Sequence, residues 1–143
     1  MGEPVALTTD QCWHLVQARG LGRVGFDVGR GPRIHPMNYV VDGETIVLRT
    51  SGDSELQLFT RLFTSGSFVA FEVDDIDAEH HQGWSVLIGG HVAPVDRQEE
   101  LDRLSRIPRP WAGGDRDHVV RITPVEVTGR RIGHQGSRRQ PAR

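Results

Sequence analysis

Regular alternation of apolar and polar residues restricts the fold of this chain more than any other feature. Residues 117–132 alternate over a long stretch, which places successive side chains on opposite faces of a strand. Asp42-Gly43 joins two further runs and is typical of a tight β-hairpin turn. No strand–helix–strand unit repeats along the sequence. We therefore predict a mainly β fold, a small antiparallel barrel with strands at residues 23–28, 33–41, 45–50, 67–73, 84–95 and 117–132.

Short helices are expected at the ends of this barrel. Three segments space their apolar residues as amphipathic helices do, namely residues 8–19, 53–63 and 97–107. Asp53 or Ser54 can cap the second of these helices. Gly89-Gly90 falls inside a predicted strand, which indicates a bend or the close approach of another backbone.

Gly20, Gly22 and Gly25 match the G-x-G-x-x-G spacing of a dinucleotide-binding loop. In that motif a strand precedes the glycines and a helix follows them, so that the pyrophosphate meets the helix N-terminus. Here the predicted helix comes first and the predicted strand second. We therefore interpret the glycines as a turn, with Gly20 as the C-cap of the helix, and not as part of a Rossmann fold.

The composition excludes several classes of function. All 17 basic residues are Arg, so without Lys the chain can form neither a pyridoxal phosphate Schiff base nor a P-loop. A net charge of −2 argues against general nucleic-acid binding, and no apolar run is long enough for a membrane span. Cys12 is the only Cys, which favours a reducing, cytoplasmic location. We expect one domain at residues 1–132 and a basic, disordered tail at 133–143.

Polar residues gather where two predicted strands end and the following helix begins. Amide groups on a strand edge can hydrogen-bond a flat heterocycle, while hydroxyl and N–H groups at a helix N-terminus, with a guanidinium, can bind phosphate. Trp84 would add a flat wall and Ser85 a small polar group. These residues indicate a phosphorylated aromatic cofactor, but an ordinary hairpin with a capped helix would carry the same set. The set is Asn38, Tyr39, Arg49, Thr50, Ser51 and Ser54.

The chain resembles a known family in the order of several segments. These are GRVGF, PRIHPMNYVVDG, TIVLRT, FVAFEVDDID, GWSVLIGGHV and VRITPVEVTGRRI. Together they resemble the pyridoxamine 5′-phosphate oxidase-like, FMN-binding split-barrel proteins, over about residues 8–132. The resemblance implies a six-stranded antiparallel split β-barrel of Greek-key type. It also implies a homodimer with two flavin sites, each built from both subunits.

The resemblance further assigns cofactor-binding roles to matching residues. From the flavin ring to the phosphate, they are Asn38, Tyr39 and Val40 along the isoalloxazine edge; Leu48, Arg49 and Thr50 along the ring and ribityl chain; Ser54 and Glu55 at the phosphate; and Trp84, Ser85 and Val86 on a bordering strand. Trp111 would contribute across the dimer. No residue is matched to a catalytic acid or base.

Glu55 departs from the family pattern, because the family usually carries a basic phosphate ligand at this position. A carboxylate repels a phosphate dianion, and losing one charge-assisted hydrogen bond costs roughly 1.5–3 kcal/mol. Compensation could come from Arg49 or Arg61, or from Arg130 and Arg131 of a partner subunit. Otherwise the site would hold the deazaflavin F420 used by relatives, or no cofactor.

The resemblance thus implies a flavin-dependent oxidoreductase that passes a hydride between the flavin and a reduced nicotinamide or small organic substrate. The alternative is a non-catalytic protein that binds flavin, deazaflavin or haem for storage, sensing or detoxification. We expect no metal site, because adjacent His80 and His81 point in different directions on an extended chain. We also expect no nucleic-acid or membrane partner.

Overall fold

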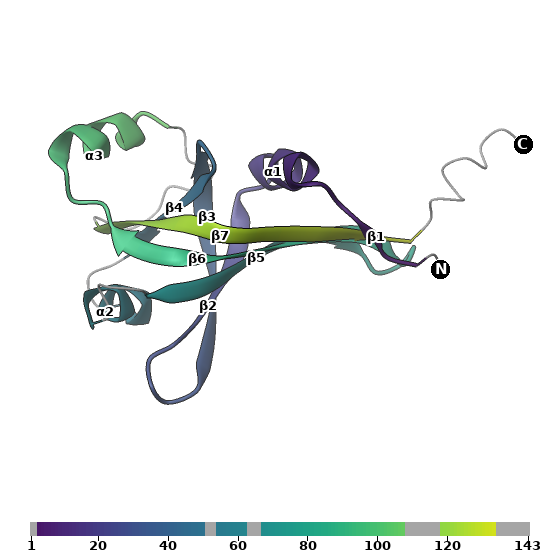
Figure 1. Ribbon diagram of the computed structural model, residues 1–143, viewed down its shortest axis with the longest axis horizontal. Coiled ribbons are helices and arrows are strands. Elements are labelled where there is room, and N and C mark those ends of the chain that lie inside the picture. The colour runs from purple at the N-terminus through teal and green to yellow at the C-terminus, as the bar shows by residue number, and fades with distance from the viewer. Residues whose placement is uncertain (1–2, 51–53, 63–66, 108–117, 134–143) are drawn as a thin grey trace, which may run out of the picture.

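The computed structural model describes residues 3–50, 54–62, 67–107 and 118–133. The elements, in chain order, are β1 Val5–Ala6, α1 Thr9–Gln17, β2 Leu21–Asp27, β3 Pro32–Asp42, β4 Thr45–Thr50, α2 Glu55–Leu62, β5 Phe68–Asp77, β6 Gln82–Pro94, α3 Gln98–Ser105 and β7 His118–Ile132 (Figure 1). No helix among the described residues has the length and apolar character needed to cross a membrane.

Six strands close into an antiparallel barrel. The strand order is β1-β7-β4-β3-β2-β5-β6, and β6 also pairs with β7, which closes the ring of β2 to β7. The first three strands of this ring form a meander, β5 returns to pair with β2, and β7 pairs with both β4 and β6. This is the predicted mainly β, six-stranded barrel of Greek-key type, and β1 adds only a short edge to β7.

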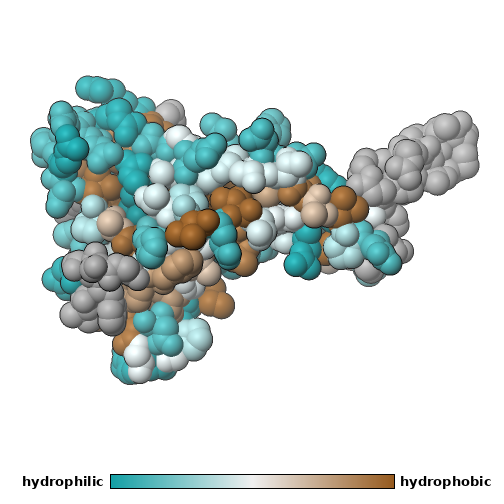
Figure 2. Space-filling model, in the orientation of Figure 1, coloured by the Kyte–Doolittle hydropathy of each residue, from teal (hydrophilic) through white to brown (hydrophobic). Residues whose placement is uncertain are grey.

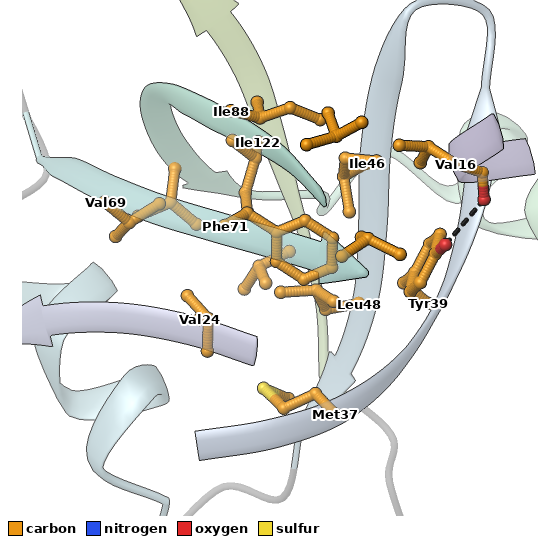
Figure 3. Close-up of a cluster of buried hydrophobic side chains, with 14 of the residues drawn as sticks. Val16, Val24, Met37, Tyr39, Ile46, Leu48, Val69, Phe71, Ile88 and Ile122 are labelled. Carbon is orange, nitrogen blue, oxygen red and sulfur yellow. Dashed lines mark hydrogen bonds between the residues drawn. The ribbon is translucent and has the colours of Figure 1, made fainter. Parts of the chain in front are cut away.

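The predicted alternation fills the barrel with apolar side chains. Phe71 lies near the centre of the core, and its ring packs edge-on against Tyr39 with the centroids 5.1 Å apart (Figure 3). The Tyr39 hydroxyl donates a hydrogen bond of 2.5 Å to the Val16 carbonyl oxygen, which ties α1 to β3. Burial raises the pKa of this phenol, so it remains a donor.

The glycine pair in β6 lies at a close approach between two backbones. The register between β6 and β7 shifts at Gly89/Gly90. A Cβ on Gly90 would contact the Thr123 carbonyl oxygen and lie 2.8 Å from the Pro124 Cα. Of the two predicted explanations, the close approach of another backbone is therefore confirmed, and it favours a residue without a side chain at position 90.

An ion network fixes α3 outside the barrel, over a small second cluster of apolar residues that includes Val47 and Leu104. The Asp42 carboxylate accepts hydrogen bonds from both Nη atoms of Arg103, each at 2.9 Å, and from Arg121 at 2.8 Å. The two guanidinium groups hold the pKa of Asp42 well below its ordinary value.

Two local predictions need correction. Helix α1 ends at Gln17 with Ala18 as its C-cap, so Gly20 is not the C-cap. Instead β2 begins at Leu21, two residues earlier than predicted, and the Gly20 carbonyl oxygen accepts a hydrogen bond from the Tyr39 N–H. Thr8 caps α1 and Ser54 caps α2, each accepting a hydrogen bond from a backbone N–H.

Candidate functional site

The barrel is split where β3 and β4 separate. The two strands pair only from Tyr39–Leu48 to Asp42–Thr45. Residues 32–38 of β3, which precede this pairing, are paired only with β2. Arg49 and Thr50 of β4, which follow it, are paired only with β7. Each strand therefore has a backbone edge along the split that pairs with no other described strand. Such an edge offers N–H donors and carbonyl acceptors to a ligand.

Side chains alternate on either side of these edges. Asn38 and Arg49 are half-buried and lie on the opposite strand faces from their buried neighbours. The Asn38 amide donates a hydrogen bond of 3.2 Å to the Gly20 carbonyl oxygen. Both residues were predicted from the sequence, and the structure places them on the two strands that border the split.

Several other predicted residues have side chains in the interior, where they stabilise the fold. Tyr39 and Leu48 belong to the apolar core, and Val40 packs against the second cluster below α3. The Thr50 hydroxyl is buried and donates a hydrogen bond of 3.1 Å to the Gln57 side-chain oxygen. The side chains of Tyr39, Leu48 and Thr50 therefore do not line the split. Of these three residues, only Thr50 lies beyond the β3–β4 pairing, where its backbone has an open edge.

Helix α2 begins beside the split and carries Ser54 and Glu55 at its N-terminus. The Ser54 hydroxyl oxygen accepts a hydrogen bond of 3.0 Å from the Gln57 N–H, so this hydroxyl caps the helix. Glu55 contacts two arginines and one histidine of the β2–β3 hairpin. Its carboxylate oxygens lie 3.0 Å from His35 Nε2, 3.4 Å from Arg33 Nε and 3.9 Å from Arg30 Nη2.

This cluster adds two arginines and a histidine to the residues considered from the sequence. The candidates named from the sequence to offset the repulsion between Glu55 and a phosphate were Arg49, Arg61, and Arg130 and Arg131 of a partner subunit. Glu55 itself lies within ion-pair distance of Arg30, Arg33 and His35. Hydrogen bonds from His35 and then Arg33 hold the pKa of the Glu55 carboxyl below its ordinary value, so it is ionised at neutral pH. Sequence reasoning missed the cluster. Arg33 and His35 are two residues apart on a predicted strand and thus share one face, which was an available signal.

Trp84, Ser85 and Val86 lie far from the split within one chain. They belong to a long arm of β5, β6 and β7 on which α1 packs (Figure 1). Along β7, Arg49 is opposite Val119, whereas Trp84 is opposite Arg131, which is twelve residues further on. At about 3.3 Å per residue this separation is roughly 40 Å.

On this arm, Trp84 and Val86 are buried in the core and Ser85 is half-buried. A single chain therefore brings Asn38, Arg49, Ser54 and Glu55 to the region of the split, but it does not bring Trp84, Ser85 or Val86 there. Trp111, Ser51 and the tail at residues 134–143 lie outside the described residues.

A second feature is a shallow hollow of about 360 Å³ on the outer face of the barrel. It is lined by Arg23, Gly25, Ile34, Ala70, Glu72 and Asp74. Arg23 donates to Glu72 at 3.0 Å and to Asp74 at 3.3 Å. Burial and the neighbouring Asp74 carboxylate raise the pKa of Glu72 to about 7, although Arg23 acts in the opposite direction.

Apolar side chains are exposed around this hollow. Ile34 is 71% exposed, Phe68 48% and Leu87 42%. Figure 2 shows apolar surface across the middle of the molecule, over the strands labelled β5, β6 and β7 in Figure 1. Within the described ranges, no group of three or more His, Cys, Asp or Glu side chains is arranged to hold a metal ion.

Comparison with known proteins gives consistent matches over this whole fold. The sequence profile of the pyridoxamine 5′-phosphate oxidase family matches residues 8–131. An uncharacterized protein of Mycobacterium tuberculosis is 34% identical over 131 residues, which is 91% of this chain and 86% of that protein.

Solved structures agree with the sequence matches. The FAD binding protein from Mycobacterium smegmatis is 31% identical, with a TM-score of 0.73 over 91% of this chain and 99% of that one. A FAD-binding protein from Mesorhizobium loti, at 19% identity, shares the fold with a TM-score of 0.74 over 92% of this chain and 100% of its own. The family profile runs from the cap of α1 to Arg131 near the end of β7.

Proposed function

This chain belongs to the pyridoxamine 5′-phosphate oxidase family, and we propose that it is a flavin-dependent oxidoreductase that binds FMN in the split between β3 and β4. The observation that carries the proposal is the pair of open strand edges beside a cationic cluster, in a fold shared with a FAD binding protein. A bound flavin would supply hydride chemistry with a reduced nicotinamide or small organic substrate. The chain would bind and orient the ring.

The residues beside the split fit a flavin ring and its side chain. Backbone donors and acceptors near Asn38 and Arg49 suit the carbonyl and ring nitrogens of a flat heterocycle. His35 is three residues from Asn38 on β3, about 10 Å at about 3.3 Å per residue. A five-carbon ribityl chain has a reach of this order. The ring would thus lie near Asn38, and the phosphate would lie near Arg33 and His35, which contact Glu55.

We propose a homodimer in which one subunit completes the flavin site of the other. Trp84 and Ser85 lie too far from Arg49 to share a site within one chain. The exposed apolar residues around the hollow form a patch of the kind that marks interfaces. Gly25 and Ala70 leave the hollow open beside Ile34, so two copies related by a two-fold axis could each place Ile34 over the hollow of the other.

The interface is tested by light scattering of Ala70→Arg, which fills the hollow with a charged side chain. We expect the dimer to become a monomer and flavin affinity to fall. Leu58→Arg, at a similarly exposed apolar residue on α2, is the matched control. A monomeric mass for the unmodified protein would contradict the shared site.

The cofactor is tested by titrating the purified protein with FMN, FAD, riboflavin and F420, followed by absorbance and fluorescence. We expect saturable FMN binding, and then bleaching of the flavin absorbance with NADH or NADPH under anaerobic conditions. Asn38→Ala should weaken FMN and riboflavin equally, because it alters the ring site, while Gln98→Ala on exposed α3 should change neither. A protein that binds none of the four cofactors would refute the proposal.

Non-catalytic binding is the second candidate, and Glu55 favours it. Its carboxylate lies among the cations that a phosphate would need, and the relative from Mycobacterium smegmatis is described only as FAD binding. Under this alternative the protein would hold flavin, deazaflavin or haem for storage, sensing or detoxification. Tight binding without reduction by any nicotinamide would support it, and a Soret band in the purified protein would indicate haem.

A further inference from the structure

We propose that Arg30, Arg33 and His35 form the binding site for the phosphate group of the flavin, and that Glu55 occupies this site as an internal anion when phosphate is absent. The inference rests on the proposed function, because it concerns the phosphate end of the same ligand. It assigns phosphate recognition to the β2–β3 hairpin instead of to a basic residue on α2. Glu55 then determines specificity by competing with the phosphate for the same cations.

The local structure of the hairpin holds these cations toward α2. Gly29 and Gly31 have φ angles of 101° and 103°, which favour glycine, and they bracket Arg30 in the turn. The Asp27 carboxylate accepts hydrogen bonds from both glycine N–H groups, at 2.6 and 3.2 Å. The turn that carries Arg30 is therefore fixed by its own backbone and one side chain.

His35 is positioned by aromatic packing. Its ring stacks on Phe26 at a centroid distance of 5.4 Å and an interplanar angle of 18°. Phe26 in turn packs against Phe59 of α2, with centroids 5.3 Å apart. This packing keeps His35 Nε2 next to the helix start, where it contacts Glu55. Arg33 lies two residues away on the same face of β3 and contacts the same carboxylate.

The charge of the cluster favours an anion that carries more than one charge. Two guanidinium groups and one imidazole surround a single carboxylate, so the cations are in excess. A phosphate monoester carries about −1.5 to −2 charges at neutral pH, and guanidinium groups bind phosphate with paired hydrogen bonds. The side chains of Arg30, Arg33, His35 and Glu55 are between 32% and 72% exposed. Glu55 can therefore move away from the other three without disrupting the core.

The test compares FMN with riboflavin, which has the same ring and no phosphate, in isothermal titrations of three variants. Arg33→Gln should weaken FMN binding about tenfold to a hundredfold, because it removes a charge-assisted hydrogen bond. Arg30→Gln, at an exposed turn residue that can change without unfolding the barrel, should weaken it less. Glu55→Gln should strengthen FMN binding about tenfold, because it frees the cations. Riboflavin affinity should remain unchanged in all three.

Inorganic phosphate provides a second readout, since it should compete with FMN and not with riboflavin. Arg97→Gln, at an exposed ion pair on α3, is the charge-matched control and should change nothing. If FMN and riboflavin both bind the unmodified protein but the three variants leave FMN affinity unchanged, the phosphate assignment is wrong and the flavin function stands. Weaker FMN binding by Glu55→Gln would also overturn it. If neither ligand binds the unmodified protein, the proposed function itself fails.

Discussion

Glu72 gives the fold a pH dependence that a single substitution should remove. Its pKa of about 7 compares with an ordinary value of 4.5. Because the carboxyl holds its proton more tightly in the folded state, the folded protein is favoured while Glu72 is protonated. This contribution is complete below pH 4.5 and decreases as the pH rises to about 7. Ionised Glu72 therefore destabilises the barrel at alkaline pH.

The expected size follows from the shift and from exposure. At about 1.36 kcal/mol per pKa unit, the full shift corresponds to roughly 3 kcal/mol. The Glu72 side chain is 33% exposed and Arg23 lies 3.0 Å away. The Arg23 ion pair is already included in this net shift. Solvent screening of the partly exposed carboxyl reduces the effect to about 1–2 kcal/mol. Glu72→Gln, which imitates the protonated carboxyl, should raise the free energy of unfolding by that amount at pH 8.5 and by less than about 0.5 kcal/mol at pH 5.

Urea unfolding at both pH values, at one protein concentration, measures this difference. Glu44→Gln, at the exposed turn between β3 and β4, controls for the loss of one negative charge. Asp74→Asn should have an effect of the same sign, because it removes the neighbouring carboxylate that raises the pKa. Equal effects of Glu72→Gln at pH 5 and 8.5, or destabilisation at pH 8.5, would show that the Arg23 ion pair dominates and would refute the reasoning.

Three further substitutions, with Gly25→Ala as a control for the first, test the packing of the barrel. Gly90→Ala should cost about 1–3 kcal/mol in urea unfolding, because its Cβ meets the backbone of β7, while Gly25→Ala, with its nearest neighbour at 3.7 Å, should be nearly neutral. Asp42→Asn should cost about 1–3 kcal/mol at pH 7 and progressively less as the pH falls below 3.8, since its ionised form is stabilised in the fold. Tyr39→Phe should cost about 1 kcal/mol by removing the hydrogen bond to Val16, and an unchanged melting temperature would contradict this.

The strands and the hairpin of β3 with β4 could largely be predicted from local patterns. The Asp42-Gly43 turn and the alternation on either side of it sufficed to place β3 and β4, and Gly89-Gly90 marked the register shift in β6. The alternation also separates Ser85, which is half-buried, from its buried neighbours Trp84 and Val86. These features depend on interactions between residues close in sequence, and this is why the sequence alone carries them.

The partners of Glu55 could not be predicted in the same way. The cations considered from the sequence were Arg49 and Arg61 of the same chain and Arg130 and Arg131 of a partner subunit. His35 and Arg33 lie 20 and 22 residues before Glu55, on a hairpin that meets α2 only when the barrel closes. The hollow on the outer face is also formed by residues that are distant in sequence, so local patterns could not predict it. Arg23 and Glu72 are 49 residues apart and become neighbours through the pairing of β2 with β5.

The position of Trp84 is the reason for proposing that two copies build each flavin site. A strand pattern says which face a side chain takes, but it does not say which chain supplies the second wall of a pocket. One chain offers the open edges of β3 and β4 and the cations near α2, and it leaves the arm that carries Trp84 and Ser85 on the far side of the barrel. If both regions bind one flavin, they must come from two copies. Loss of the dimer and loss of flavin affinity should then occur together in Ala70→Arg, although Ala70 lies in neither region.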